Sequence, residues 1–404
     1  MITRRGIGLL VVAIIGFFVA SATRVGWLHI ADAVLAGTMV LSAVLPQLSV
    51  ARLKASAGFT PRRRSASEIA PVAGDAVDLH IALENRAPYP RLFVAASARP
   101  TISEGGTPAR FFLAHVPARS SGKMSGQIEC ARRGWQSIDE IRIECRAPFG
   151  LFRARRRPAV SARVLVYPMW LPLRQLKLLD ALNGEQPGRR PARRGDEVAG
   201  SRRYVAGDAM RDMHWKNTAR TGRPTVKEFD SGSEETLTIA FETGALLGEG
   251  GDTTLEYSIS IAASVAKLVL ARGGTVQLGL TGTNRDVFYD WTELMTRLAL
   301  IQSTTSPAMA DSLQAAEPGS RMLAIVSGAH YAQVAAMASA AHRGVATAAV
   351  VMEGFASGDA AASALRALSV AGVPAVMCRR GQLARGVEAI DRGAVESKLA
   401  ERVA

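Results

Sequence analysis

Asp208 and His214 are the two side chains with the clearest potential for catalysis in this sequence. A carboxylate and an imidazole can share general acid–base work in a hydrolase. A covalent mechanism would also need an activated Ser or Cys, and no motif places such a nucleophile beside His214. A hydrolase-like enzyme that uses Asp208 and His214 therefore stays the alternative interpretation, and the preferred interpretation is not enzymatic.

The surrounding stretch, residues 202–229, is dense in side chains that bind rather than react. Arg203, Arg211 and Arg220 can form forked ion pairs with carboxylates such as Glu228. Two interpretations follow. The stretch is either an internal clasp, with Trp215 largely buried and its indole N–H bonded, or a docking surface for a partner. We predict the clasp first and the contact surface second.

Charge is distributed unevenly along the chain and indicates an anionic partner for the first part. Before Glu234 there are 36 basic and 18 acidic residues, and from Glu234 onward there are 13 basic and 17 acidic residues. Nucleic acid and lipid headgroups are both anionic. The basic residues lack the interleaved aromatic side chains of a base-stacking surface, so we predict a lipid bilayer and no nucleic acid as partner.

Two long apolar runs at the N-terminus predict the membrane attachment. Residues 6–22 carry no charge, and residues 28–50 carry only Asp32. Each run is long enough to cross a bilayer as a helix, so residues 1–50 are predicted to form a transmembrane hairpin. Basic residues flank both outer ends, which places the soluble part in the cytoplasm of a multi-pass membrane protein. A signal peptide cleaved after residues 20–22 is the alternative for the first run.

The soluble part divides into four segments by composition and periodicity. Residues 51–70 read as a basic juxtamembrane linker, and alternating apolar residues within 71–168 predict a small antiparallel β-sandwich. Residues 169–233 hold an Arg-rich loop and the stretch described above. Alternating strands and helices in 234–404 predict a doubly wound parallel α/β domain. The fold class is therefore membrane-anchored α/β.

The stretch 202–229 resembles the signature of the domain of unknown function 58 family. The residues that carry the resemblance are Arg203, Tyr204, Gly207, Asp208, Arg211, Trp215, Lys216, Ala219, Arg220 and Glu228. Upstream, 132–134, 148–152 and 164–168 are similar to that family's preceding elements. Ala147 is a departure, because the family usually has Asp there.

The resemblance implies a C-terminal domain similar to von Willebrand factor A domains, which often hold a divalent ion in an Asp-x-Ser-x-Ser loop. The matching positions here are Glu242, Gly244 and Leu246. Glu242 keeps a carboxylate, but both hydroxyls that a hard cation would use are replaced. We predict no metal at this loop. A glycine-rich phosphate-binding motif is also missing after the first strand, so no cofactor is predicted.

The resemblance also implies partners. It suggests an AAA+ ATPase of the MoxR type and, in some cases, a membrane transglutaminase-like protein. The sequence is therefore interpreted as a membrane-tethered interaction or scaffold protein, not an enzyme. Its expected role is that of an adaptor in the assembly or maturation of membrane or envelope complexes.

Overall fold

The computed structural model describes residues 1–61, 70–101, 108–180, 197–204, 210, 213–230, 236–244, 246–280, 286–303, 308–327, 331–356 and 358–393. The chain forms two compact units, Met1–Met169 and Trp170–Ala404. The first unit holds the two N-terminal helices and the antiparallel sheets. The second holds the mixed α/β sheet.

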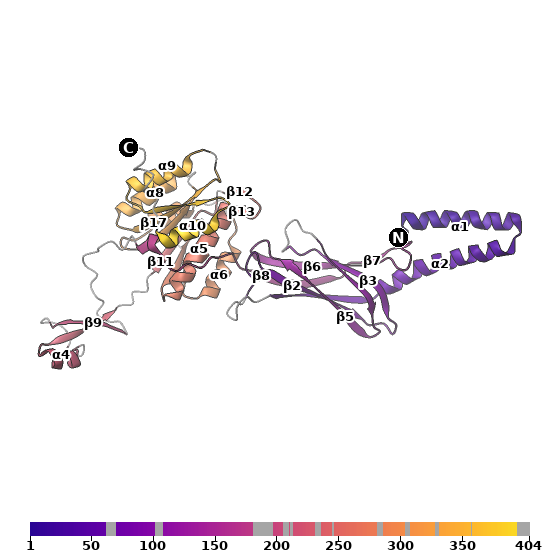
Figure 1. Ribbon diagram of the computed structural model, residues 1–404, viewed down its shortest axis with the longest axis horizontal. Coiled ribbons are helices and arrows are strands. Elements are labelled where there is room, and N and C mark those ends of the chain that lie inside the picture. The colour runs from indigo at the N-terminus through magenta and orange to yellow at the C-terminus, as the bar shows by residue number, and fades with distance from the viewer. Residues whose placement is uncertain are drawn as a thin grey trace. The chain divides into compact units, whose positions relative to one another are not determined.

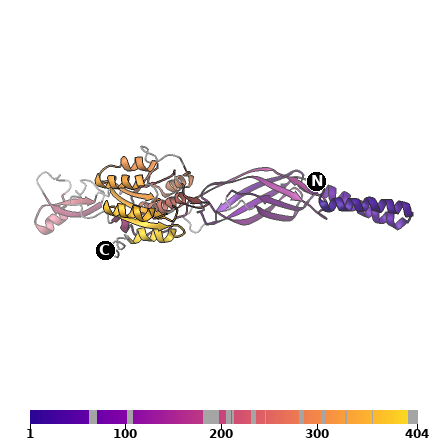
Figure 2. The same cartoon turned by 90° about the horizontal axis from the view of Figure 1, so that it is seen from above.

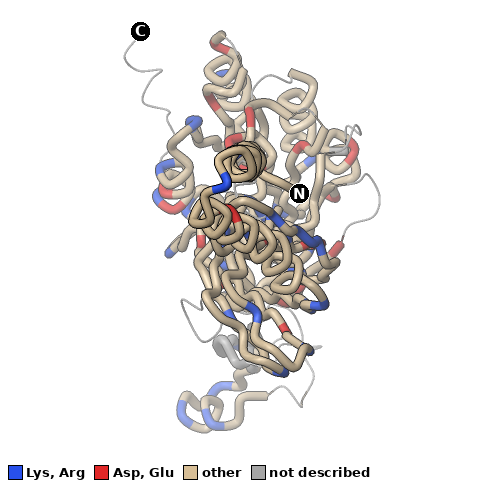
Figure 3. The backbone as a smooth tube through the Cα atoms, turned by 90° about the vertical axis from the view of Figure 1, so that its right-hand side faces the viewer, with Lys and Arg blue, Asp and Glu red and all other residues tan. Residues whose placement is uncertain are grey.

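The first unit begins with two adjacent helices, α1 (Arg4–Thr23) and α2 (Gly26–Val50), which carry few charged residues (Figure 3). Thr3 caps α1, because its hydroxyl accepts a hydrogen bond from Gly6 N at 3.2 Å. Both helices are long enough and apolar enough to cross a membrane, and little of either is buried within the protein. Helix α5 (Thr254–Ala271) is also long enough and apolar enough to cross a membrane, but it is mostly buried in the second unit.

The rest of the first unit consists of two antiparallel sheets (Figure 1). One sheet has the order β1-β2-β5, and the other has the order β4-β3-β6-β7, with β8 also paired to β6. The strands are β1 (Leu53–Pro61), β2 (Ala76–Asn85), β3 (Arg91–Ala98), β4 (Ala109–Val116), β5 (Ser120–Glu129), β6 (Gly134–Cys145), β7 (Ala154–Arg156) and β8 (Ala159–Val166). Both sheets contribute residues to one hydrophobic core.

Alternation along the strands explains how that core forms. In β2 every second residue from Val77 to Leu83 is fully buried, as the sequence pattern predicts. In β6 the buried residues Ile138 and Ile141 are three positions apart, which breaks the alternation. A register shift between Ile138 and Glu140 inserts the extra residue and returns the apolar side chains to the core.

The interpretation of residues 51–70 as a linker is wrong for Leu53–Pro61. These residues form β1 and pair along their whole length with β2, from Leu53 opposite Asn85 to Pro61 opposite Val77. The alternation in this segment is weak because most of its side chains are small and only half-buried. Residues 62–69 lie outside the described part of the chain.

Most of the second unit is the part coloured orange to yellow in Figure 2. This unit contains a six-stranded sheet with the order β15-β14-β11-β16-β17-β18. All neighbours are parallel except the edge strand β15. Its strands are β11 (Thr236–Phe241), β14 (Thr275–Gly279), β15 (Asp286–Phe288), β16 (Arg321–Val326), β17 (Ala346–Glu353) and β18 (Ala375–Arg379). Its further helices are α6 (Trp291–Leu300), α7 (Ala308–Gln314), α8 (Tyr331–His342), α9 (Ala360–Val370) and α10 (Leu383–Arg392).

The helices of this unit divide between the two faces of the sheet. Met322, Ala324 and Val326 of β16 pack in one cluster with residues of α7, α8 and α9. The intervening Leu323 and Ile325 are fully buried but lie outside that cluster. Because side chains alternate across a strand, they point to the other face, where α5 contacts the sheet. The unit is therefore an α/β sheet, parallel except for β15 and covered on both faces, in line with the alternating strands and helices that residues 234–404 predict.

The segment 170–180 belongs to this unit, so the interpretation of 169–233 as one loop-and-signature segment is wrong at its start. The ammonium of Lys267 lies 4.3 Å from the ring centre of Trp291 and 5.6 Å from that of Trp170. Further along, the short helix α3 (Lys177–Asp180) buries Leu178 and Leu179. These contacts fasten the segment to α5, α6 and α10.

Candidate functional site

The signature stretch folds as a small module of two strands and one helix. Strand β9 (Glu197–Arg203) pairs antiparallel with β10 (Thr225–Asp230), and α4 (Trp215–Thr221) lies between them in the sequence. An isolated bridge joins Met213 to Val226, and both of these side chains are buried. The short helix is therefore held by strand pairing on either side of it.

Local hydrogen bonds fix the position of α4 on β10. His214 caps its start, because Nδ1 accepts a hydrogen bond from Asn217 N at 3.1 Å. Gly222 ends it in the left-handed conformation, with a φ of 66° that glycine adopts without strain. On the inner side, the Thr218 hydroxyl accepts from Thr225 N at 3.0 Å. Thr218 therefore marks the face of α4 that packs against the strand.

The opposite face of α4 is exposed and carries four of the signature residues. Trp215, Lys216, Ala219 and Arg220 are all exposed, and none of the residues of α4 is buried. They are spaced i, i+1, i+4 and i+5, which places them together on one side of a helix. This exposed face of Trp215, Lys216, Ala219 and Arg220 is called the α4 face below.

The prediction that Trp215 is largely buried is wrong. Its side chain is 62% exposed, since α4 contacts β10 through Thr218 and not through the indole. A clasp held by Trp215 is therefore not what the geometry provides. An exposed indole that shares a helix face with two cationic side chains instead has the composition of a contact surface.

The other signature residues are only partly described. Tyr204 is half-buried, and its N–H donates to the Pro224 carbonyl at 3.0 Å. Arg203 is exposed and interacts with another residue of the chain. Gly207, Asp208 and Arg211 lie outside the described residues, as does the side chain of Glu228.

The hydrolase interpretation gains no geometric support. His214 uses Nδ1 to cap α4, so that nitrogen is occupied in a structural bond. Asp208 lies outside the described residues. The imidazole therefore has an evident structural role that explains its position in the motif.

The carboxyl end of β11 is where an open α/β sheet of this kind would bind a ligand, because strand order reverses between β11 and β16. There both carboxylate oxygens of Glu242 bond within the chain. Oε1 accepts from Gly244 N at 3.0 Å, and Oε2 accepts from Gln333 Nε2. Glu242 thus orders the loop that follows β11, while Leu246 points its side chain to the surface.

This loop does not fit the divalent ion that the family resemblance implies. Two nearby buried oxygens, Ser327 Oγ and Gln333 Oε1, have no hydrogen-bond partner. However, the one carboxylate is already bonded to two N–H groups, and Gly244 and Leu246 supply no hydroxyl. Across the described residues, no group of three or more His, Cys, Asp or Glu side chains is arranged to hold a metal.

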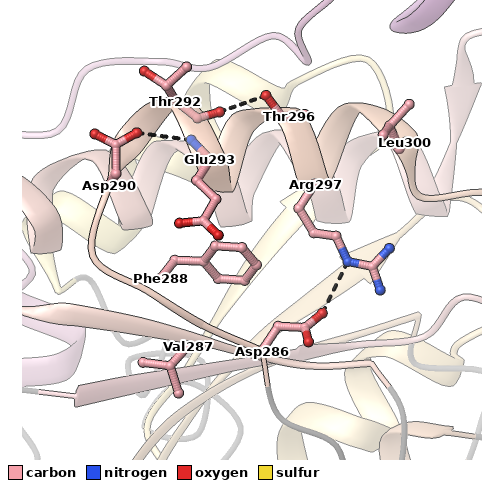
Figure 4. A pocket seen from close by; sticks show the side chains of 9 residues that line it. All are labelled: Asp286, Val287, Phe288, Asp290, Thr292, Glu293, Thr296, Arg297 and Leu300. Atoms are coloured by element: carbon pink, nitrogen blue, oxygen red, sulfur yellow. Dashed lines mark hydrogen bonds and ion pairs between the residues drawn. The ribbon is translucent and has the colours of Figure 1, made fainter.

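A second feature of this unit is an open groove of about 940 Å³ between β15 and α6 (Figure 4). Its acidic residues serve the local structure. Asp290 caps α6 by accepting from Glu293 N at 3.0 Å, and this bond lowers the pKa of Asp290. Arg297 Nε donates to Asp286 Oδ2 at 3.1 Å. The rest of the lining combines the apolar Val287, Phe288 and Leu300 with Thr292, Thr296 and Glu293.

The comparison with known families agrees with the signature. Residues 200–370 match the family described as Protein of unknown function DUF58. The matched region contains the module with the α4 face and continues through α9 of the α/β unit. The resemblance inferred from the motif is therefore supported over this region.

Two relatives are similar to this chain over part of their length. Uncharacterized protein YeaD of Bacillus subtilis is 22% identical over 225 residues, which is 54% of this chain and 54% of the relative. Uncharacterized protein Rv1480 of Mycobacterium tuberculosis is 33% identical over 103 residues, 26% of this chain and 32% of the relative. The chain thus spans about half the length of the first relative and a third of the second.

Similarity to solved structures is low. The ASH/PapD-like domain of human CEP192 is 16% identical, covering 29% of this chain and 88% of that domain, with a TM-score of 0.17. An exo-β-N-acetylglucosaminidase from Vibrio harveyi is 10% identical, covering 79% of this chain and 60% of that enzyme, with a TM-score of 0.20. Scores this low carry no argument about fold or activity.

Sequence reasoning missed the residues that orient the α4 face. Thr218 and Thr225 fasten the helix, and Asn217 accepts a hydrogen bond from Arg220 at 3.2 Å. A Thr in the middle of a short helical segment gives little signal by itself. The exposed position of Trp215 depends on which side of the helix those threonines occupy.

Proposed function

We propose that this chain is a membrane-tethered interaction protein whose α4 face binds a partner protein, and that it is not an enzyme. The observation that carries the proposal is the exposed Trp215, which shares one exposed helix face with Lys216 and Arg220. Trp and Arg are the residues most enriched among side chains that dominate binding energy at interfaces. An indole left in water gains more from being covered than a polar side chain does.

The charge of the α4 face indicates the chemistry of the partner. Lys216 and Arg220 are both cationic and lie one helical turn apart on the exposed side of α4. A complementary surface would present carboxylates around an apolar pocket that receives the indole. Such a surface discriminates by charge and by shape together.

A MoxR-type AAA+ ATPase is the partner that the family resemblance favours, with a membrane transglutaminase-like protein as a possible further component. In this proposal the chain is an adaptor in the assembly or maturation of membrane or envelope complexes. The match of residues 200–370 to the DUF58 family supports the resemblance on which this partner choice rests.

We also propose that the six-stranded sheet of the second unit and its helices (the α/β unit) form a von Willebrand factor A-like domain. The antiparallel strands of the first unit, β1 to β8 (the β unit), are proposed to form a β-sandwich. In chain order the six sheet strands run 3-2-1-4-5-6 across the sheet, which is a doubly wound arrangement. The two antiparallel sheets of the first unit share one core, as the layers of a sandwich do.

The soluble units are proposed to be cytoplasmic, with α1 and α2 crossing the membrane. Residues Met1–Thr3 bond to Gly150–Arg153, so the start of α1 adjoins the same β unit that follows α2. Both outer ends of the hairpin then lie on one side, and Arg4, Arg5 and Arg52 are on that side. Basic flanks favour the cytoplasm. A C-terminal reporter that is active only outside the cytoplasm should be silent.

A direct binding measurement tests the central proposal. The full chain in lipid nanodiscs would be titrated with a purified MoxR-type ATPase from the same organism, and Kd measured for wild type and for Trp215→Ala. Loss of an interface hot spot costs at least about 2 kcal/mol, so affinity should fall by roughly 30-fold or more.

Tyr331→Ala is the matched control, because Tyr331 is an aromatic side chain of the same unit that is 79% exposed and lies outside α4. Its affinity should equal that of wild type. Equal binding by the Trp215→Ala and wild-type proteins would contradict the proposed role of the α4 face. A wild-type chain with no affinity for the ATPase would contradict the choice of partner.

A further inference from the structure

The first turn of α1 is bonded to a loop of the β unit, residues 148–152 (Figure 1). The N-cap residue Thr3 donates its N–H to the Leu151 carbonyl at 2.8 Å and its hydroxyl to the Gly150 carbonyl at 2.8 Å. Arg153 N also donates to the Met1 carbonyl at 2.8 Å. The position of the loop is therefore fixed relative to the start of α1.

Glycine at position 6 makes this close approach possible. A Cβ on Gly6 would lie only 2.4 Å from the Leu151 carbonyl oxygen, a distance that real Cβ atoms do not adopt. The backbone of α1 thus rests directly on the backbone of the loop. Phe149 precedes Leu151 by two residues, so its Cα is at most roughly 14 Å from that of Gly6.

Phe149 is exposed at this position, with 55% of its side chain accessible. The uncharged run of α1 begins at Gly6, so the hydrocarbon boundary of a bilayer would lie close to that residue. The headgroup region on each side of the hydrocarbon is roughly 5–7 Å thick. The Cα of Phe149 is thus within about two headgroup thicknesses of the helix entry, and its exposed ring is of the kind that gains from partial insertion at the membrane interface.

Basic residues surround the same entry point. Arg4 and Arg5 in the first turn of α1 and Arg52 just after α2 are all exposed. Juxtamembrane Lys and Arg residues are attracted to anionic lipid headgroups. The surface around the loop thus combines an apolar ring with cationic side chains, as interfacial membrane anchors do.

We propose that the loop 148–152 is a membrane-interface anchor, in which Phe149 inserts at the headgroup–acyl boundary of an anionic bilayer while Arg4, Arg5 and Arg52 contact lipid phosphates. The anchor rests on the proposed membrane crossing by α1 and α2, and it is independent of the α4 face. It fixes the β unit against the bilayer instead of leaving it on a free tether.

A depth measurement tests the anchor in the full chain. A nitroxide spin label would be attached at Phe149→Cys in vesicles of phosphatidylcholine and phosphatidylglycerol. The relative accessibility of the label to oxygen and to a water-soluble nickel chelate reports its depth. The three native cysteines are buried, so the label should react at the introduced site, and unlabelled wild-type protein checks this.

Two further label sites make the result decisive. Trp135→Cys replaces another exposed aromatic, 59% accessible, at the opposite end of β6 and roughly 35–40 Å along the strand from the loop. Ile15→Cys lies in the middle of α1. We expect the oxygen-to-nickel accessibility ratio to be highest at Ile15, intermediate at Phe149 and lowest at Trp135, with a several-fold difference between the last two.

The outcomes separate the two proposals. A label at Phe149 that matches Trp135, while Ile15 reports lipid, would overturn the anchor and leave the membrane crossing intact. A label at Ile15 that reports water would overturn the membrane crossing and the anchor together. Folding of each labelled variant is checked by circular dichroism, and an exposed Phe149 leaves no core contact to lose.

Discussion

Asn85 organises the end of β2 and provides the sharpest test of the packing described for the β unit. It is 1% exposed. Its Nδ2 donates to the carbonyls of Tyr89 at 2.9 Å and Pro117 at 2.9 Å. Its Oδ1 accepts from Ala87 N at 3.0 Å and from Arg91 Nε at 3.2 Å. Replacing Asn85 by Ala therefore removes the partner of several buried polar groups at once.

The expected cost follows from the groups that lose their partner. Ala87 N and the Nε of Arg91 would be left buried without an acceptor, and each such group costs about 1–3 kcal/mol. We expect Asn85→Ala to destabilise the β unit by about 3–5 kcal/mol, near the upper end for single substitutions.

Hydrogen exchange of the full chain in nanodiscs, followed by mass spectrometry, measures this locally. Amides of β2 and β3 should exchange faster by roughly two to four powers of ten, since about 1.4 kcal/mol is one power of ten. Peptides of the α/β unit serve as an internal reference, and Glu84→Ala is the control on the same strand because the Glu84 side chain is 47% exposed. An increase below about tenfold in β2 and β3 would refute the role assigned to Asn85.

Five other predictions concern individual side chains and the loop after β11. Arg91→Met should destabilise less than Asn85→Ala in the same exchange measurement, because both Nη atoms of Arg91 are buried without a hydrogen-bond partner among the described residues. The Nε bond to Asn85 and the Tyr89 ring, whose centre lies 4.6 Å from Cζ, offset only part of the cost of burying the charge of Arg91. Gly386→Ala should cost about 1–3 kcal/mol in a thermal melt, since its Cβ would lie 2.4 Å from Cys378 Sγ. Burial raises the pKa of Cys130 and Cys378 to about 12, so neither thiol should react with iodoacetamide at pH 8 until the protein is unfolded, and alkylation in the folded protein would contradict this. Because those pKa values are raised on folding, the stability they contribute should fall as the pH rises above about 9. Millimolar Mg²⁺ should leave the melting temperature unchanged, and a saturable increase that is lost in Glu242→Ala would show a metal site.

Strong periodicity made most of the fold predictable. The alternation in β2 and the alternating strands and helices of residues 234–404 predict the antiparallel and parallel sheets that the structure contains. Two of the elements that were missed, β15 and α10, bury little. Strand β15 has three residues, and α10 buries only Gly386, Val387 and Ile390, so its apolar stripe is narrow. Such elements depend on pairing with neighbours and leave a weak pattern in the sequence.

The candidate site was located by its motif, but the orientation of its side chains was not. A helix of two turns such as α4 is too short for its apolar residues to define a period. The single Trp215 fits a buried clasp and an exposed contact equally well in sequence. In the structure Trp215 is exposed because Thr218 and Thr225 hold the opposite face of the helix against β10 through their hydroxyls.

Site-specific photocrosslinking at Ala219 tests the central claim most directly. Ala219 lies on the α4 face beside Trp215, and its small side chain can be replaced by a benzophenone amino acid without removing the indole. In native membranes we expect one main protein adduct from position 219, none from the exposed position 331, and loss of the adduct when Trp215→Ala is added. The absence of an adduct at 219, or equal adducts at 219 and 331, would contradict the claim that the α4 face binds a partner.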